Sequence, residues 1–95
     1  MYKAARRSLD EGGTKLKYVY IIRSIETPDR YYTGLTGNVD RRLSDHNYGK
    51  SPHTSKYAPW KLVSFTAFTD DARARAFEKY LKSGSGRAFA VKHLR

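Results

Sequence analysis

The sequence predicts an α+β fold, a small three-stranded, mainly antiparallel sheet flanked by helices in the order β-β-α-β-α-α. Three observations lead to this prediction. Three segments are rich in β-branched and aromatic residues, as strands are. Segments with helix-capping residues at their starts follow the second and third of these. The chain has only 95 residues and no Cys, so one compact domain without disulfides must hold all the elements.

The first two strands are expected to pair as an antiparallel hairpin. They cover residues 18–24, YVYIIRS, and residues 30–36, RYYTGLT. A Pro-Asp pair at 28–29 marks the turn between them. The connection is long for a hairpin, but the two strands are adjacent in the sequence and of similar length.

The first helix is expected over residues 39–48. Asn38 is a favourable N-cap, and Gly49 is well placed to end the helix. Residues 50–59 are polar and contain two prolines, which predicts a loop. The segment WKLVSFTAF at 60–68 returns to the composition of a strand.

The C-terminal part is expected to be helical. A second helix begins after Thr69 or Asp70, both good caps, and runs to about Ser83. The glycines at 84–86 are expected to break it, and a short closing helix follows over residues 87–94.

The domain itself is assigned to residues 17–95, and residues 1–16 are expected to form a flexible N-terminal arm. Residues 1–17 are polar and charged and contain no apolar run, so no signal peptide is predicted. A cytoplasmic location follows, with the protein associated with the nucleoid when it binds DNA.

The strong positive charge indicates a polyanionic partner. Lys and Arg number 19 and Asp and Glu nine, which gives a net charge of +10. Nucleic acid is the commonest partner of such a field. A membrane-surface role is disfavoured because the basic residues are spread out rather than gathered beside an apolar helix. High charge can also simply keep a small protein in solution.

Arg42 and His46 are the first candidate site residues. With Val39 and Leu43 they have the spacing of one helix face, and the apolar pair must turn that face toward the core. An inward Arg is costly unless it is paired, and its planar guanidinium suits a phosphate. The alternative is that Arg42 pairs with a structural carboxylate at the rim of the helix.

Glu78 is the candidate in the second helix. It flanks the apolar stripe of that helix, and its carboxylate could hold a divalent cation near bound phosphate. The alternative is an ordinary ion pair with Lys82, four residues further on. Tyr20 and Tyr32, in the two hairpin strands, would by themselves be interpreted as packing residues.

Together these residues resemble the GIY-YIG nuclease family, in particular its short stand-alone bacterial members. The motifs that carry the resemblance follow in order: Tyr18-Val19-Tyr20, Tyr32-Thr33-Gly34, Arg42 and His46 in the first helix, Pro59-Trp60, and Glu78. They extend over about residues 17–94. In the name motifs this chain has Tyr18 in place of Gly, and Val19 and Thr33 in place of Ile.

The resemblance implies a metal-dependent endonuclease that hydrolyses phosphodiester bonds in DNA, with repair or recombination as its expected setting. Glu78 would hold one Mg²⁺ or Mn²⁺, and Arg42 would stabilise charge on the phosphate. Tyr20 would be the general base, assisted by Tyr32 and His46. Since a free Tyr has a pKa near ~10, the nearby Arg and metal are expected to lower that of Tyr20.

Three alternatives remain open at this point. His46, whose ordinary pKa is ~6.5, could itself be the base, with Tyr20 only positioning the water. The domain could be a non-catalytic nucleic-acid-binding module on the same fold. Finally, because basic charge gives affinity without sequence choice, a protein partner could supply the targeting.

Overall fold

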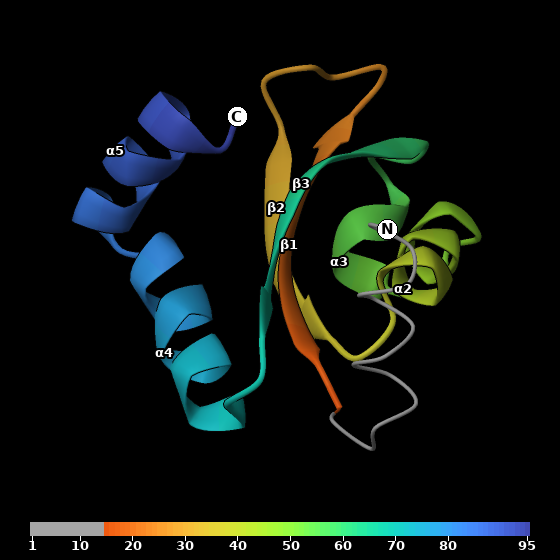
Figure 1. Ribbon diagram of the computed structural model, residues 1–95. Coiled ribbons are helices and arrows are strands. Elements are labelled where there is room, and N and C mark those ends of the chain that lie inside the picture. Colours follow the sequence, from red (N-terminus) through yellow and green to blue (C-terminus); the bar gives the residue numbers. More distant parts are fainter. Residues whose placement is uncertain (1–14) are drawn as a thin grey trace, which may run out of the picture.

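The computed structural model describes residues 15–95 and shows a sheet between two layers of helices (Figure 1). In chain order its elements are β1 (Lys17–Ser24), β2 (Tyr31–Thr36), α2 (Val39–Asn47), α3 (Pro52–Ser55), β3 (Trp60–Phe68), α4 (Asp71–Leu81) and α5 (Gly84–His93). Apart from the short α3, this order confirms the predicted α+β fold. The predicted arm at 1–16 lies, except for its last two residues, outside the described part of the chain.

The central strand of the sheet is β1. It pairs antiparallel with β2 on one side and with β3 on the other, so the strand order is β2-β1-β3. Tyr20 lies opposite Gly34 of β2 and opposite Phe65 of β3. The pairing with β3 shifts register between Ile21 and Ile22. Since β2 is an edge strand, side chains from both faces of the sheet can meet beside it.

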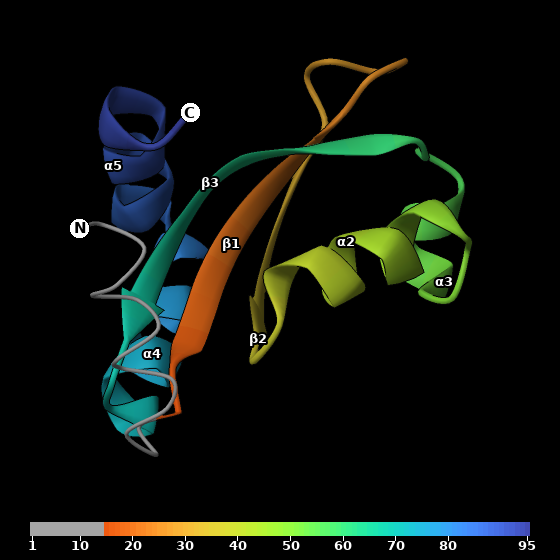
Figure 2. The ribbon, with the colours of Figure 1, turned by 45° about the vertical axis from the view of Figure 1, so that its right-hand side comes forward.

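Each face of the sheet has its own core. The helices α4 and α5 cover one face, and α2 and α3 cover the other (Figures 1 and 2). The buried residues on the α4/α5 face are all aliphatic: Val19, Ile21, Ala74, Leu81 and Ala90. Those on the α2/α3 face are Tyr20, Ile22 and Trp60. Because side chains alternate along β1, this strand contributes residues to both cores.

Two predictions about the helices were wrong in detail. The predicted loop at 50–59 contains the helical turn α3, because Pro52 occupies the first helical position after Ser51 and its fixed φ favours a helix start. The glycines at 84–86 form the first turn of α5 instead of a break. The Ser83 hydroxyl caps that turn by accepting from the backbone N–H of Gly86 at 3.1 Å.

Gly86 lies in the first turn of α5 for a steric reason. A Cβ at this position would overlap the backbone of Tyr80 and Leu81 in α4. A glycine therefore allows the two helices to approach each other closely. None of the helices formed by residues 15–95 has the length and apolar character needed to cross a membrane.

Candidate active site

Tyr20 lies at the centre of the site and is only 1% exposed. Its ring lies across β2 at Gly34, where a Cβ would overlap the hydroxyl oxygen and the adjoining ring carbons. Gly34 makes room for the Tyr20 side chain, which directs the hydroxyl toward the β2 edge of the sheet.

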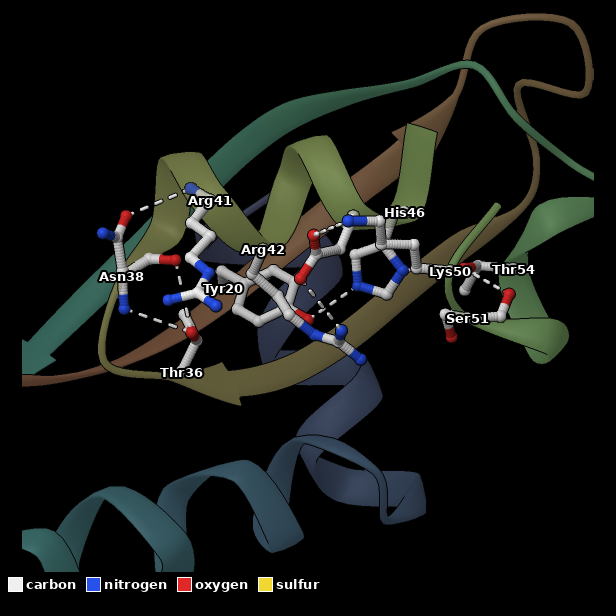
Figure 3. Close-up of polar contacts among 10 residues, drawn as sticks. Tyr20, Thr36, Asn38, Arg41, Arg42, His46, Lys50, Ser51 and Thr54 are labelled. Atoms are coloured by element: carbon white, nitrogen blue, oxygen red, sulfur yellow. Dashed lines mark hydrogen bonds and ion pairs between the residues drawn. The ribbon is translucent and has the colours of Figure 1, made fainter. Parts of the chain in front are cut away.

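A buried chain of hydrogen bonds runs from Tyr20 through His46 to Thr54 (Figure 3). The Tyr20 hydroxyl lies 2.8 Å from Nε2 of His46, and Nδ1 of His46 lies 2.7 Å from Oγ1 of Thr54. His46 is fully buried and Thr54 is 2% exposed. The indole N–H of Trp60 donates to the Thr54 carbonyl at 2.9 Å, which fixes α3 against the sheet.

The bonds of Thr54 favour one direction for this chain. When its hydroxyl donates to the Ser51 carbonyl, 3.4 Å away, its oxygen accepts from His46. His46 then carries its proton on Nδ1 and accepts the Tyr20 proton with Nε2. The Tyr20 O–H is therefore oriented toward a proton acceptor.

Burial keeps both groups uncharged near neutral pH. Burial, together with the nearby Tyr32, raises the pKa of Tyr20 to about 12. Arg42 acts in the predicted, opposite direction, but burial outweighs it in the protein alone. Burial, and then the charge of Arg42, lower the pKa of His46 from its ordinary value of 6.5.

Arg42 lies beside the Tyr20 hydroxyl on the same face of α2 as His46 (Figure 3). Asn38 fixes the start of this helix, since its side chain accepts from the backbone N–H of Arg41 at 3.0 Å. The Arg42 guanidinium is 3.7 Å from the Asp45 carboxylate, and its side chain remains 34% exposed. The predicted carboxylate at the helix rim therefore exists, and the guanidinium also remains accessible to a ligand.

Glu78 reaches the site from the other face of the sheet. It projects from α4, whose buried residues Ala74 and Leu81 pack on the sheet. Its carboxylate is 2.6 Å from the ammonium group of Lys82 and its side chain is 23% exposed. The predicted ion pair thus exists. Glu78 is nevertheless near enough to the Tyr20 hydroxyl for its charge to favour the neutral phenol.

Tyr32 joins the two sides at the edge of the sheet. Its ring centroid is 4.9 Å from that of His46 and 6.3 Å from that of Tyr20. The Lys82 ammonium lies 5.9 Å from the centre of the same ring. The five predicted site residues are therefore gathered around the β2 edge: Tyr20, Tyr32, Arg42, His46 and Glu78.

Thr54 is the site residue that the sequence reasoning missed. It lies in a four-residue helix, which is too short to show a periodic pattern. Ser51 and Pro52 signal a helix start, and this signal could have placed Thr54 on a helical turn. Its partner, 8 residues earlier in the sequence, could not have been read from local spacing.

The donor set fits a loosely held divalent ion. Within residues 15–95, no three His, Asp or Glu side chains form a cage for a metal. Glu78 offers one carboxylate at the border of the site. One carboxylate with substrate oxygens suits Mg²⁺ or Mn²⁺, because Mg²⁺ retains much of its hydration.

Comparisons with known proteins find a matching family and several relatives. Residues 16–90 match the family described as the GIY-YIG catalytic domain. The structure-specific endonuclease subunit SLX1 homolog of Giardia intestinalis is 38% identical over 65 residues, which are 64% of this chain and 18% of that protein. This chain thus spans less than a fifth of that relative.

Small bacterial proteins match over more of their length. The UPF0213 protein CPE1444 of Clostridium perfringens is 35% identical over 68 residues, 70% of this chain and 71% of that protein. The solution NMR structure of the UPF0213 protein BH0048 from Bacillus halodurans superposes with a TM-score of 0.50 at 32% identity. That match covers 81% of this chain and 83% of the other.

Proposed function

This chain belongs to the GIY-YIG family, whose catalytic domain is a nuclease fold, and from that premise we propose that it is a divalent-metal-dependent endonuclease hydrolysing phosphodiester bonds in DNA. The observation that carries the proposal is the chain Tyr20–His46–Thr54, placed beside Arg42 at an accessible sheet edge. It supplies a proton relay next to a phosphate-binding cation.

The pKa values favour a concerted relay. A proton on Tyr20, with a pKa of about 12, would have to move to His46, whose pKa lies below 6.5. That gap disfavours a tyrosinate in the resting protein. The attacking water therefore gives its proton to the Tyr20 oxygen as Tyr20 passes its own proton to His46. Both proton transfers occur in the same transition state.

We infer that Tyr20 rather than His46 takes the proton of the attacking water. His46 is fully buried, and both of its ring nitrogens are already hydrogen-bonded, to Tyr20 and to Thr54. It has no nitrogen left for a water molecule, so it can act only through Tyr20. Of the two alternatives open from the sequence, these contacts support the one in which Tyr20 is the base.

Arg42 and Glu78 would each exchange a protein partner for the substrate. Arg42 leaves Asp45 and binds the scissile phosphate through parallel N–H donors. Glu78 would leave Lys82 and hold the divalent ion, which would stabilise charge on the phosphate and leaving oxygens. Lys82, once released, remains beside Tyr32 and adds a positive charge at the site.

We place the activity on DNA in the cytoplasm, in repair or recombination, with a protein partner supplying the targeting. The net charge of +10 supports the binding of nucleic acid in general. The name of the Giardia relative, a subunit of a structure-specific endonuclease, supports a substrate chosen by its structure and a partner subunit.

The proposal is tested by incubating the full chain with supercoiled plasmid and with branched DNA, with Mg²⁺ or Mn²⁺ and then with EDTA. We expect metal-dependent cleavage that Glu78→Gln reduces by about 10²- to 10³-fold. Glu26→Gln, which removes an exposed carboxylate in the hairpin turn, is the matched control and should cut normally. Absence of metal-dependent cutting on every substrate would contradict the proposal.

The relay is tested separately in single-turnover cleavage. Tyr20→Phe should slow cleavage by about 10²- to 10⁴-fold, as loss of a general base does. Thr54→Val should slow it less and change its pH profile, because Nδ1 of His46 loses its acceptor. Thr54→Ser retains the hydroxyl and should restore both the cleavage rate and its pH profile. Full activity in Tyr20→Phe would rule out Tyr20 as the base.

A non-catalytic nucleic-acid-binding module is the second candidate, and one observation favours it. Tyr20 is almost fully buried, while Arg42 and Glu78 are both paired within the protein. In that case the five residues would be a closed structural network. DNA binding without metal-dependent cleavage in the experiment above would select this candidate.

A further inference from the structure

A second feature of the β2 edge is a basic cleft between β2 and the helices α4 and α5. Its volume is about 260 Å³. Its lining includes Tyr31 and Tyr32 of β2, Lys82 after α4, Arg87 in α5, and Arg95. No Asp or Glu side chain of the described residues lines it. The cleft begins where the candidate active site ends, because Tyr32 belongs to both.

The C-terminal part of the chain, residues 79–95, has basic side chains but no acidic ones. Glu78 is the last carboxylate side chain in the sequence, and residues 79–95 contain five Lys and Arg residues. Several cations elsewhere in the described residues are paired, as Arg73 is with Asp70 and Arg75 with Asp71. Within residues 15–95, Arg87 and Arg95 form no ion pair. The cleft therefore concentrates uncompensated positive charge.

Aromatic rings lie beside two of these cations, and one of the two, Lys82, also pairs with Glu78. The Arg95 guanidinium carbon is 4.2 Å from the centre of the Tyr31 ring, and the Lys82 ammonium is 5.9 Å from that of Tyr32. A guanidinium over a ring keeps its N–H groups available for an anion. The cleft thus combines a positioned guanidinium with a lining that contains no Asp or Glu, and Lys82 alone of its three cations is paired with a carboxylate.

The location of the cleft identifies its ligand. The ring of Tyr32 contacts His46 in the candidate active site, and Lys82 pairs with Glu78. A strand whose scissile phosphate lay at Arg42 would bring its next phosphates past these two residues. Phosphate oxygens are the acceptors that Arg binds best.

We propose that this cleft binds backbone phosphates of the cleaved strand adjacent to the scissile one. The strand then runs along the β2 edge from Tyr20 toward α5. The inference rests on the proposed function, since it takes the strand at the active site as its origin. It adds a direction to the bound strand and assigns Arg87 and Arg95 to its binding.

The first test measures binding without cleavage. Glu78→Gln protein in metal-free buffer is titrated with fluorescein-labelled DNA at several salt concentrations. Adding Arg87→Ala should weaken binding about tenfold and lower the slope of log K against log salt by about 0.9 on duplex DNA. Lys92→Ala removes the same charge from the same helix outside the cleft and should change affinity less than twofold.

The second test locates the contact on the strand. Single neutral methylphosphonates are placed at successive positions on either side of the cut. With the wild-type chain, one or two positions on a single side should slow cleavage. With Arg87→Ala these substitutions should have no additional effect, because the contact is already missing.

The outcomes separate this inference from the proposed function. If Arg87→Ala and Lys92→Ala bind equally well, and methylphosphonates act alike in both, the cleft assignment is wrong while the nuclease proposal survives. If neither protein binds DNA, the proposed function fails and the inference fails with it.

Discussion

The strand β1 contributes side chains to both faces of the sheet, but the two faces are stabilised in different ways. Toward α4 and α5, β1 presents Val19 and Ile21, which meet an entirely aliphatic buried set. Toward α2 and α3 it presents Tyr20, whose hydroxyl begins a buried polar chain with His46 and Thr54. One face is held by non-directional apolar burial, and the other by directional hydrogen bonds.

This difference indicates where change can be tolerated. An aliphatic core can exchange side chains of similar volume at modest cost. A buried polar chain cannot, because each lost partner leaves an unsatisfied group. In the part of the chain that the structure describes, every buried side-chain polar atom has a partner. The α4/α5 face should therefore mainly determine stability, and the α2/α3 face mainly activity.

The largest effect is expected from Gly86→Ala on the α4/α5 face. The new methyl would overlap backbone atoms of Tyr80 and Leu81, which cannot move without separating the two helices. We expect a loss of about 3 kcal/mol or more in the free energy of unfolding, measured by urea denaturation. Gly84→Ala, in the same turn with open space around it, should be neutral or stabilise by about 0.5–1 kcal/mol.

Gly34→Ala is the corresponding change on the α2/α3 face. Here the methyl meets the end of the Tyr20 side chain rather than backbone, so the ring must move while the sheet can persist. We expect cleavage to fall by about a hundredfold, with a cooperative unfolding transition retained. Gly37→Ala, with nothing within 4 Å, is the control. A Gly34→Ala protein that cuts normally would mean that the Tyr20 position is not critical.

A smaller effect concerns pH. The pKa of His46 is lower in the folded protein than its ordinary value of 6.5. The unfolded chain therefore binds the proton more readily, so stability is fully present above pH 6.5 and decreases as the pH falls below it. The slope from this one group is at most about 1.4 kcal/mol per pH unit.

Thermal unfolding between pH 5 and 8 measures this dependence. His46→Gln should flatten it, whereas His53→Gln, on the exposed side of α3, should not. No such titratable group is buried among the aliphatic residues of the α4/α5 face. An unchanged pH dependence in His46→Gln would mean that the polar chain does not control acid stability.

Local signals were sufficient to predict most of the fold. The third strand at 60–68 was predicted with its observed bounds, because its composition is distinctive and Pro59 and Asp70 delimit it. The cap Asn38 likewise fixed the start of α2. Gly84 and Gly86 misled the prediction because glycine normally weakens helices. Gly86 is in a helix because of close contact with α4, which sequence spacing does not reveal.

The candidate site could be predicted only in part. Arg42 and His46 follow from helical spacing, since an inward charge or imidazole is unusual. Their position relative to Tyr20 depends on how α2 packs on the sheet. The position of Glu78 relative to Tyr20 depends on how α4 packs beside the β2 edge. The family resemblance supplied these relations before the geometry did. Neither approach found Thr54, whose role depends on a contact made by a single helical turn.

The smallest expected effect compares two helix caps, one on each face. Asn38 caps α2 by accepting from the Arg41 N–H, and Asp70 caps α4 by accepting from the Ala72 N–H. Replacing either by Ala should cost about 1 kcal/mol of stability, measured by urea denaturation. Equal costs would show that the two caps are energetically equivalent.

Their effects on cleavage should differ. Asn38 is only four residues before Arg42, so fraying of the first turn of α2 displaces the phosphate-binding guanidinium. Glu78 lies two turns beyond Asp70, on a part of α4 fixed by Ala74 and Leu81. Single-turnover cleavage should fall several-fold in Asn38→Ala and little in Asp70→Ala. The reverse order would place the sensitive part of the site on α4, and the division of labour between the two faces would then be wrong.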